Sequence, residues 1–271
     1  MLELKKELEK IKDSFSRISE IVYQTPVLSS ISINKALKAD ITFKAECLQE
    51  TGSFKLRGAS SAISVLSKEE KSRGVVAFSS GNHAQGIAYA SRELGTSAKI
   101  VMPSDAPKIK IWKTQEYGAE VIFYERDEDN REEIGFSIAK EEGRKLIKPF
   151  DDLNVIYGQG TAALEVMDEV DTKFDMSVVC CSGGGLAAGT GIVLKNSLSD
   201  CQLYTAEPKD WNDHEKSFLQ NNIVSIKTKK HGMCDALENP QPGEITFRIN
   251  SALNTKGLSA NDKYIIEAMR I

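Results

Sequence analysis

Short apolar runs and amphipathic helical patterns alternate along most of this chain. Runs such as Lys99–Met102 and Met176–Cys180 are almost continuously apolar, as expected of parallel strands buried on both faces. Such regular alternation predicts an α/β fold in two lobes, with parallel sheets joined by right-handed helical crossovers. The expected strands are Ile41–Glu46, Val75–Ser79, Ala98–Met102, Glu120–Tyr124, Phe174–Cys180 and Gln202–Ala206. The expected helices are Leu56–Leu66, His83–Leu94, Pro107–Tyr117, Arg131–Glu142, Thr161–Val170 and Leu186–Leu198.

Length, charge and cysteine content exclude several classes of protein. The 271 residues are nearly twice the average domain of about 150 residues, which fits one large domain or two smaller lobes. A net charge of −4 leaves no basic excess to neutralise the phosphates of a nucleic acid. The charge-rich N-terminus is not a targeting signal, and no apolar run approaches the ~18 residues of a membrane span. Five cysteines without a C-x-x-C pair fit a reducing compartment, so we expect a cytoplasmic protein without nucleic-acid or membrane partners.

A glycine-rich segment, Cys181–Leu186, follows a predicted strand and opens a predicted helix. The N–H groups and the positive dipole end at such a junction bind phosphate, and glycines let the phosphate approach closely. The segment also satisfies G-x-G-x-x-A, and Glu207 ends the next strand, where a dinucleotide site has its ribose-binding acid. A cofactor phosphate site, a dinucleotide site and a plain strand–helix turn are therefore all open from this segment alone.

Two other segments carry side chains suited to catalysis. Lys55 lies between Phe54 and Leu56 at the start of a predicted helix. An isolated lysine is usually a surface residue, but an amine in apolar surroundings loses its proton more easily and can form a Schiff base. Residues Ser79–His83 also join a strand to a helix, where hydroxyls and free N–H groups either bind a carboxylate or simply cap the helix.

Together, these three segments resemble a known family. S-F-K-x-R-G at Ser53–Gly58, S-S-G-N-H-x-Q-G at Ser79–Gly86 and the glycine segment, in this order, are similar to the fold-type II pyridoxal-phosphate enzymes. Within that group the chain resembles the threonine/serine dehydratase and serine racemase branch. The resemblance covers about residues 20–271 and includes the shorter stretches Thr25–Leu28, Met102–Lys108, Tyr117–Val121, Gly158–Thr161, Glu207–Pro208 and Pro242–Glu244.

The resemblance implies roles for individual residues. Lys55 would hold pyridoxal phosphate (PLP) as a Schiff base and act as the base at the substrate Cα, and Ser80 matches the opposite-face acid/base of the racemases. The cofactor would bind Phe54, Lys55, Asn82, Ser182, Gly183, Gly184, Gly185 and Leu186. The substrate carboxylate would bind Ser79, Ser80, Asn82 and His83. Glu207, the carbonyl of Trp211 and Asp213 match the spacing of a cation site in this branch, with oxygen ligands suited to Mg²⁺ or Ca²⁺.

The same resemblance implies a fold and an activity. It implies the two-lobed fold of the tryptophan synthase β type, with residues 1–72 and 149–271 as the large PLP-binding domain and 73–148 as the small domain. The expected protein is a homodimeric ammonia-lyase that converts serine, threonine or 3-hydroxyaspartate to a 2-oxo acid and ammonia by β-elimination. A serine or aspartate racemase and a weakly active or non-catalytic PLP-binding protein are the alternatives, because the motifs do not separate these outcomes.

Three features depart from the family pattern. Ser182 and Ala236 stand where the family often has glycine. Relatives continue past the position of Ile271 with a segment whose hydroxyl bonds the pyridine nitrogen of the cofactor. We therefore expect the native chain to extend beyond Ile271.

Overall fold

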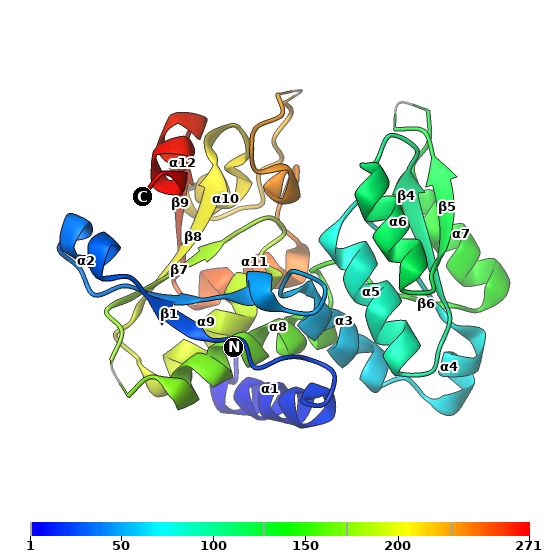
Figure 1. Cartoon of the computed structure of the whole chain (residues 1–271), viewed down its shortest axis with the longest axis horizontal. Coiled ribbons are helices and arrows are strands. Elements are labelled where there is room, and N and C mark those ends of the chain that lie inside the picture. The colour runs from blue at the N-terminus through cyan, green and yellow to red at the C-terminus, as the bar shows by residue number, and fades with distance from the viewer. Residues whose placement is uncertain (1, 127, 172, 229) are drawn as a thin grey trace. The chain divides into compact units, whose positions relative to one another are not determined.

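The computed structural model describes residues 2–126, 128–171, 173–228 and 230–271. These residues form two compact units, and Figure 1 labels the helices and strands of both. The first unit comprises Met1–Lys12, Thr25–Ala45 and Gly160–Ile271, and the second comprises Asp13–Gln24 and Glu46–Gln159. The large and small domains expected at residues 1–72 with 149–271 and at 73–148 stay a prediction.

The second unit is built around a parallel sheet in the order β5-β4-β3-β6. Its strands are β3 (Val75–Phe78), β4 (Ala98–Pro103), β5 (Glu120–Tyr124) and β6 (Lys145–Leu146). Its helices are α3 (Lys55–Ser64), α4 (Lys68–Arg73), α5 (Asn82–Glu93), α6 (Lys108–Glu116) and α7 (Arg131–Glu142), preceded by the short 3-10 helix η1 (Glu46–Leu48). Two longer helices, α1 (Leu4–Ile18) and α8 (Leu153–Glu169), contribute residues to both units.

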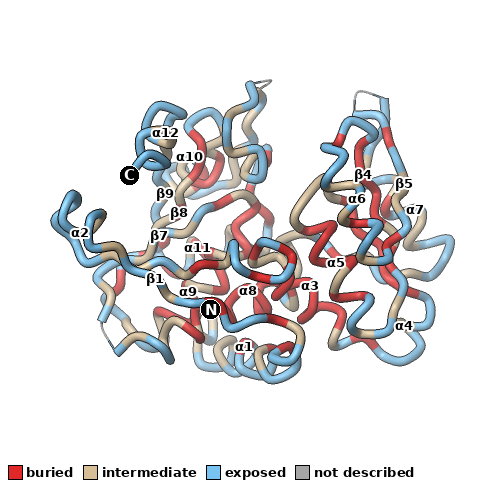
Figure 2. Tube along the Cα trace, viewed as in Figure 1, coloured by how far each residue is buried: buried red, intermediate tan, exposed pale blue. Residues whose placement is uncertain are grey.

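Both faces of this sheet are buried along its central strands, β3 and β4, where successive residues face opposite sides. Val75, Ala77 and Ile100 join one hydrophobic cluster with residues of α3 and α5. Val76 and Val101 join a second cluster, packed against α7. Figure 2 shows the buried residues concentrated along α3, α5 and the strands. This two-sided burial explains why the strands read as continuous apolar runs.

The first unit contains a three-stranded parallel sheet in the order β7-β8-β9 and a two-stranded antiparallel sheet, β1-β2. The strands are β1 (Val27–Ser29), β2 (Thr42–Lys44), β7 (Met176–Cys180), β8 (Gln202–Pro208) and β9 (Lys256–Ala260). The helices are α2 (Ile31–Leu37), α9 (Gly185–Ser197), α10 (Asp213–Gln220), α11 (Glu244–Ala252) and α12 (Asp262–Met269), with the 3-10 helices η2 (Lys209–Trp211) and η3 (Asp235–Leu237).

A buried ion pair supports the start of α3. The guanidinium of Arg57, whose side chain is fully buried, donates from Nε and Nη2 to the two carboxylate oxygens of Glu46, each over 2.8 Å. Nη2 also donates to the carbonyl of Tyr23 over 3.1 Å. Because the geometry is bidentate and a further acceptor is present, the guanidinium has strong hydrogen-bond partners although it is removed from water.

The α/β fold and the parallel sheets predicted from the sequence are confirmed. Helix α7 has the predicted bounds, and β3, β4 and β5 differ from theirs by at most one residue. Three expectations were wrong in detail. Thr42–Lys44 pairs antiparallel with β1, and α8 begins at Leu153, eight residues before the expected Thr161. Strand β7 is not buried on both faces, because Met176 and Val178 are exposed. None of the described helices combines the length and apolarity needed to cross a membrane.

Candidate active site

Lys55 is the first residue of α3 and follows a tight turn in which Gly52 has φ +74°. Its half-buried amine donates to the carbonyl of Pro149 over 2.8 Å and lies 5.3 Å from the ring centroid of Phe54. The hydroxyls of Thr51 and Ser53 in the same turn are buried and have no hydrogen-bond partner among the described residues. The turn therefore presents an amine, an aromatic face and two unsatisfied hydroxyls together.

The predicted carboxylate-binding segment Ser79–His83 joins the end of β3 to α5. Ser79, Ser80 and Asn82 are half-buried, and the Ser79 hydroxyl accepts a hydrogen bond from the Gly81 N–H over 3.2 Å. The N–H groups of the first turn of α5 have no acceptor within the helix. Hydroxyls and helix N–H groups at the carboxyl end of a parallel strand form a suitable place for an anion.

His83 is buried and neutral. Its Nε2 lies 3.2 Å from the carbonyl of Ile147, so we assign the ring proton to Nε2, and Nδ1 is left without a partner. Burial, aided by the charge of Lys55, lowers the pKa of His83 to about 3. The imidazole therefore carries no positive charge toward a substrate carboxylate at neutral pH.

The structure brings Lys55 and the Ser79–His83 segment together within the second unit. The residues just after β6 provide acceptors for both, because Ile147 pairs with His83 and Pro149 with Lys55. Strands β3 and β6 are parallel neighbours, so their carboxyl ends lie at one edge of the sheet. Helix α5 also packs closely on α3: a Cβ at Gly86 would lie 3.1 Å from the carbonyl carbon and oxygen of Lys55.

The glycine loop, Ser182–Gly185, belongs to the first unit and joins β7 to α9. Gly184 has φ +91° as the residue before α9. A Cβ at this position would lie 2.6 Å from Cε1 of His214, so the loop has neither the backbone conformation nor the space for a larger residue. Leu186, the second residue of α9, is half-buried.

The three residues predicted to bind a cation lie around the end of β8 and the start of α10. Glu207 and Asp213 are buried, with 3 % and 0 % of their surface exposed. Glu207 accepts the N–H groups of His214 and Glu215 over 3.0 and 2.9 Å, and its carboxyl group interacts with that of Asp213. Burial raises the pKa of both carboxyl groups, and their mutual repulsion adds to the shift for Asp213. Trp211 directs its indole N–H to the carbonyl of Lys230 over 2.9 Å, so only its backbone carbonyl would be a ligand.

Comparisons with known proteins identify the family of this chain. The family described as pyridoxal-phosphate dependent enzyme matches residues 18–271. The chain belongs to the fold-type II pyridoxal-phosphate-dependent enzymes. It is 42 % identical over 259 residues to an L-threo-3-hydroxyaspartate ammonia-lyase of Saccharomyces cerevisiae, covering 96 % of this chain and 79 % of the relative.

Serine racemases are similar to this pyridoxal-phosphate-dependent enzyme to nearly the same degree. The serine racemase of Schizosaccharomyces pombe is 39 % identical to this chain, and the match covers 96 % of this chain and 80 % of the racemase. The crystal structure of serine racemase from Dictyostelium discoideum aligns with a TM-score of 0.89 at 37 % identity, covering 97 % of this chain and 84 % of that one. Lyases and racemases thus share the family at similar identity.

The described residues fit pyridoxal phosphate. The buried hydroxyls of Thr51 and Ser53, for which the described residues offer no partner, belong to the turn that precedes Lys55, whose amine would bond the aldehyde. The glycine loop leaves no space for a Cβ at Gly184, and its N–H groups begin a helix, as a phosphate requires. Both parts are of the chemical type that the cofactor needs.

Four functional or supporting residues were missed in the sequence: His214, Thr246 and Asn250 beside the glycine loop, and Pro149 as the acceptor for Lys55. The spacing of Thr246 and Asn250 by four residues places both on one helix face and could have revealed them, had α11 been predicted. No local pattern marks a carbonyl such as that of Pro149 as a lysine partner.

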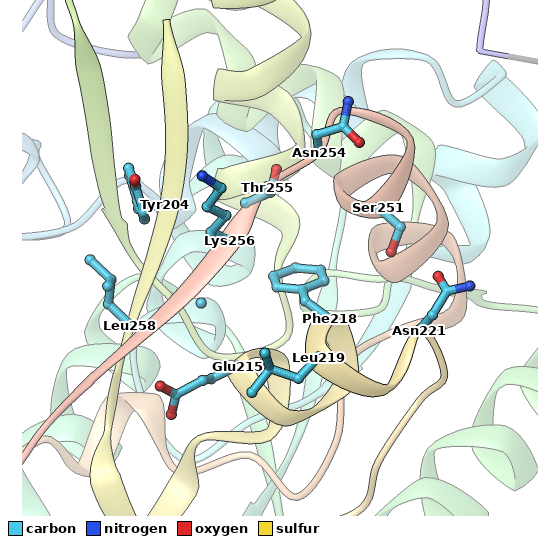
Figure 3. A pocket seen from close by; sticks show the side chains of 11 residues that line it. Tyr204, Glu215, Phe218, Leu219, Asn221, Ser251, Asn254, Thr255, Lys256 and Leu258 are labelled. Atoms are coloured by element: carbon cyan, nitrogen blue, oxygen red, sulfur yellow. The ribbon is translucent and has the colours of Figure 1, made fainter.

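A cavity of about 580 Å³ lies elsewhere in the first unit, between α10 and β9. Figure 3 shows Glu215, Phe218 and Leu219 of α10 and Lys256 and Leu258 of β9 around it. None of the predicted site residues lines it. The size of a cavity therefore does not indicate the site in this chain.

Proposed function

We propose that the protein is a PLP-dependent ammonia-lyase that acts by β-elimination on a small 3-hydroxy amino acid, namely serine, threonine or 3-hydroxyaspartate. The observation that carries the proposal is that the Lys55 amine and His83, in the first turn of α5, bond to carbonyls two residues apart, those of Pro149 and Ile147, while α5 packs on α3. A base and an anion site on adjacent helices are what an enzyme needs to hold an amino acid by its carboxylate and remove its α-proton. Relatives named as L-threo-3-hydroxyaspartate ammonia-lyases support this choice at 42 % and 41 % identity.

The residues of the chain divide the work as follows. PLP, when bound, supplies the electron sink for the carbanion formed at Cα. Lys55 holds the cofactor and takes the Cα proton. Ser79, Ser80 and the first N–H groups of α5 bind the substrate carboxylate, while Asn82 bonds the phenolic oxygen of the cofactor and Phe54 lies beside its ring. The glycine loop Ser182–Gly185, with Leu186, binds the phosphate.

His83 contributes its backbone and its shape in this proposal. Its side chain is directed to Ile147 and stays neutral, so the N–H of His83, in the first turn of α5, is the group offered to the carboxylate. A protonated imidazole would bind the anion more tightly but would need a charge in a buried place, which burial opposes.

Incubation of the purified protein and PLP with each of the three amino acids tests the proposal. We expect 2-oxo acid and ammonia from at least one of them, and an absorption band of the bound cofactor that Lys55→Ala abolishes. Lys148→Ala, which removes an exposed lysine close to Pro149, is the matched control and should retain both. A colourless protein that ignores PLP, or a coloured one that yields no oxo acid, would contradict the lyase proposal.

A second candidate is a serine or aspartate racemase of the same family. The observation in its favour is the half-buried Ser80 hydroxyl at the segment predicted to bind the carboxylate, together with the serine racemases at 39 % and 41 % identity. Ser80 would return the proton to the opposite face of Cα. The enantiomer ratio of serine and aspartate in the same incubations separates the two activities, and Ser80→Ala should suppress racemisation more than elimination.

A divalent cation, Mg²⁺ or Ca²⁺, is proposed at Glu207, Asp213 and the carbonyl of Trp211. Two buried carboxyl groups next to one another, of which Glu207 raises the pKa of Asp213, fit a cation in place of a proton. Within residues 2–126, 128–171, 173–228 and 230–271, no cluster of three or more His, Cys, Asp or Glu side chains is placed to hold a metal. The proposed third protein ligand is accordingly a backbone carbonyl.

A further inference from the structure

Thr246 and Asn250 lie on one face of α11, four residues apart, and both contact the glycine loop. The Thr246 hydroxyl donates to the carbonyl of Gly183 over 2.6 Å, and Nδ2 of Asn250 donates to the carbonyl of Gly184 over 3.2 Å. Both side chains are fully buried. Two consecutive peptide units of the loop are therefore held from the same side by side chains of one helix.

Holding a carbonyl also orients the next N–H. In a planar trans peptide the C=O and the N–H of the following residue point in opposite directions. A donor on the Gly183 carbonyl therefore turns the Gly184 N–H away from α11, and a donor on the Gly184 carbonyl does the same for the Gly185 N–H. The Gly184 N–H interacts with the thiol of Cys181, which is only a weak acceptor.

The surroundings leave these two peptide units little freedom. The His214 ring lies against Gly184, where a Cβ would lie 2.6 Å from Cε1 of the ring and 3.1 Å from Nδ2 of Asn250. Gly183 also accepts the N–H of Gly243, just before α11, over 3.4 Å. Hydrogen bonds buried in this way do not exchange with water and so fix the loop before any ligand arrives.

We propose that Thr246 and Asn250 are positioning residues that preorganise the N–H groups of the glycine loop for the phosphate of the cofactor, an inference that rests on the proposed phosphate site. Neither side chain touches the cofactor in this scheme. Their effect is on the phosphate alone, because the aldehyde and ring of the cofactor are assigned to Lys55, Phe54 and Asn82. Removing either donor should therefore weaken the binding of PLP but not that of pyridoxal, which has the same ring and aldehyde but no phosphate.

The experiment compares the affinities of PLP and pyridoxal, measured by titration of the cofactor absorption band. Thr246→Val keeps the shape of the side chain and removes the donor, Thr246→Ser restores it, and Thr205→Val makes the same change at a fully buried threonine of β8 whose hydroxyl bonds the carbonyl of Lys256. We expect Thr246→Val to lower the affinity for PLP about fivefold to tenfold, as loss of one buried hydrogen bond implies. The affinity for pyridoxal should fall less than about twofold. Thr246→Ser and Thr205→Val should keep the wild-type ratio of the two affinities.

Each outcome decides the matter. If Thr246→Val leaves the ratio unchanged, or weakens both ligands equally, the positioning role is wrong and Thr246 only stabilises the fold. If wild type itself binds pyridoxal as tightly as PLP, the proposed phosphate site fails instead, so the two failures are distinguishable. Asn250→Leu repeats the test through the second donor and decides it should Thr246→Val not fold, as judged by circular dichroism.

Discussion

Replacing His83 by glutamine should reduce the acid sensitivity of the fold. The folded chain holds the pKa of His83 at about 3, whereas the unfolded chain returns it to about 6.5. Below pH 6.5 the unfolded state therefore takes up a proton that the folded state refuses. The resulting loss of stability grows as the pH falls from 6.5 toward 3, and it reaches about 2 kcal/mol at about pH 5, since each pKa unit is worth about 1.4 kcal/mol.

Urea unfolding of wild type and His83→Gln at about pH 7.5 and about pH 5 measures the effect. Glutamine can still donate to the Ile147 carbonyl but has no proton to gain. No cofactor is added, because a ligand that bound the two proteins differently would bring its own pH dependence. We expect the unfolding free energy of wild type to fall by about 2 kcal/mol more than that of the variant between the two pH values. Parallel losses in the two proteins would refute the argument and mean that the buried imidazole accepts a proton in the folded state.

Three further predictions concern stability. Gly158→Ala should cost about 1–3 kcal/mol of unfolding free energy, because its Cβ would lie 2.4 Å from the backbone carbonyl of Arg57; an unchanged urea midpoint would show that the two helices separate easily. Glu46→Leu should cost about 3–5 kcal/mol of unfolding free energy by removing the carboxylate that neutralises the buried Arg57, and the double variant with Arg57→Met should recover much of that loss. Chelation of divalent cations should lower the melting temperature if Glu207 and Asp213 bind a cation, whereas a melting curve insensitive to both chelator and added Mg²⁺ would favour two buried carboxyl groups that share a proton.

The parts of the fold that could be predicted are those whose burial leaves a strong pattern. Strands β3 and β4 are buried on both faces, and α7 is bounded by the N-cap Asn130 and by Gly143 with φ +64°. The early turns of α8 were missed because Gly158 and Gly160 usually disfavour a helix. These glycines are present for packing: a Cβ at Gly158 would meet α3 and one at Gly160 would lie 3.1 Å from the Gly189 carbonyl of α9.

The segment from α10 to β9 carried the weakest pattern. Its helices are short, and β9 contains Gly257, where a Cβ would lie 2.2 Å from the Cα of Glu215. That close approach needs a glycine in a strand, which weakens the sequence signal. The weak pattern of this segment also explains why the sequence identified the glycine loop but not Thr246 and Asn250, which lie on a helix that was not predicted. Motifs mark the groups that meet a ligand, whereas their support depends on which helix packs behind them.

The bidentate pair of Glu46 and Arg57 also constrains how this chain can vary. A change at either position alone leaves a charge in the interior without its ionic partner, whereas an apolar pair of similar volume can be tolerated. If these two residues diverge in evolution, the chain must therefore either pass through a destabilised single variant or change both residues at once. A library that randomises both codons together should yield functional apolar pairs that no scan of single substitutions would reveal.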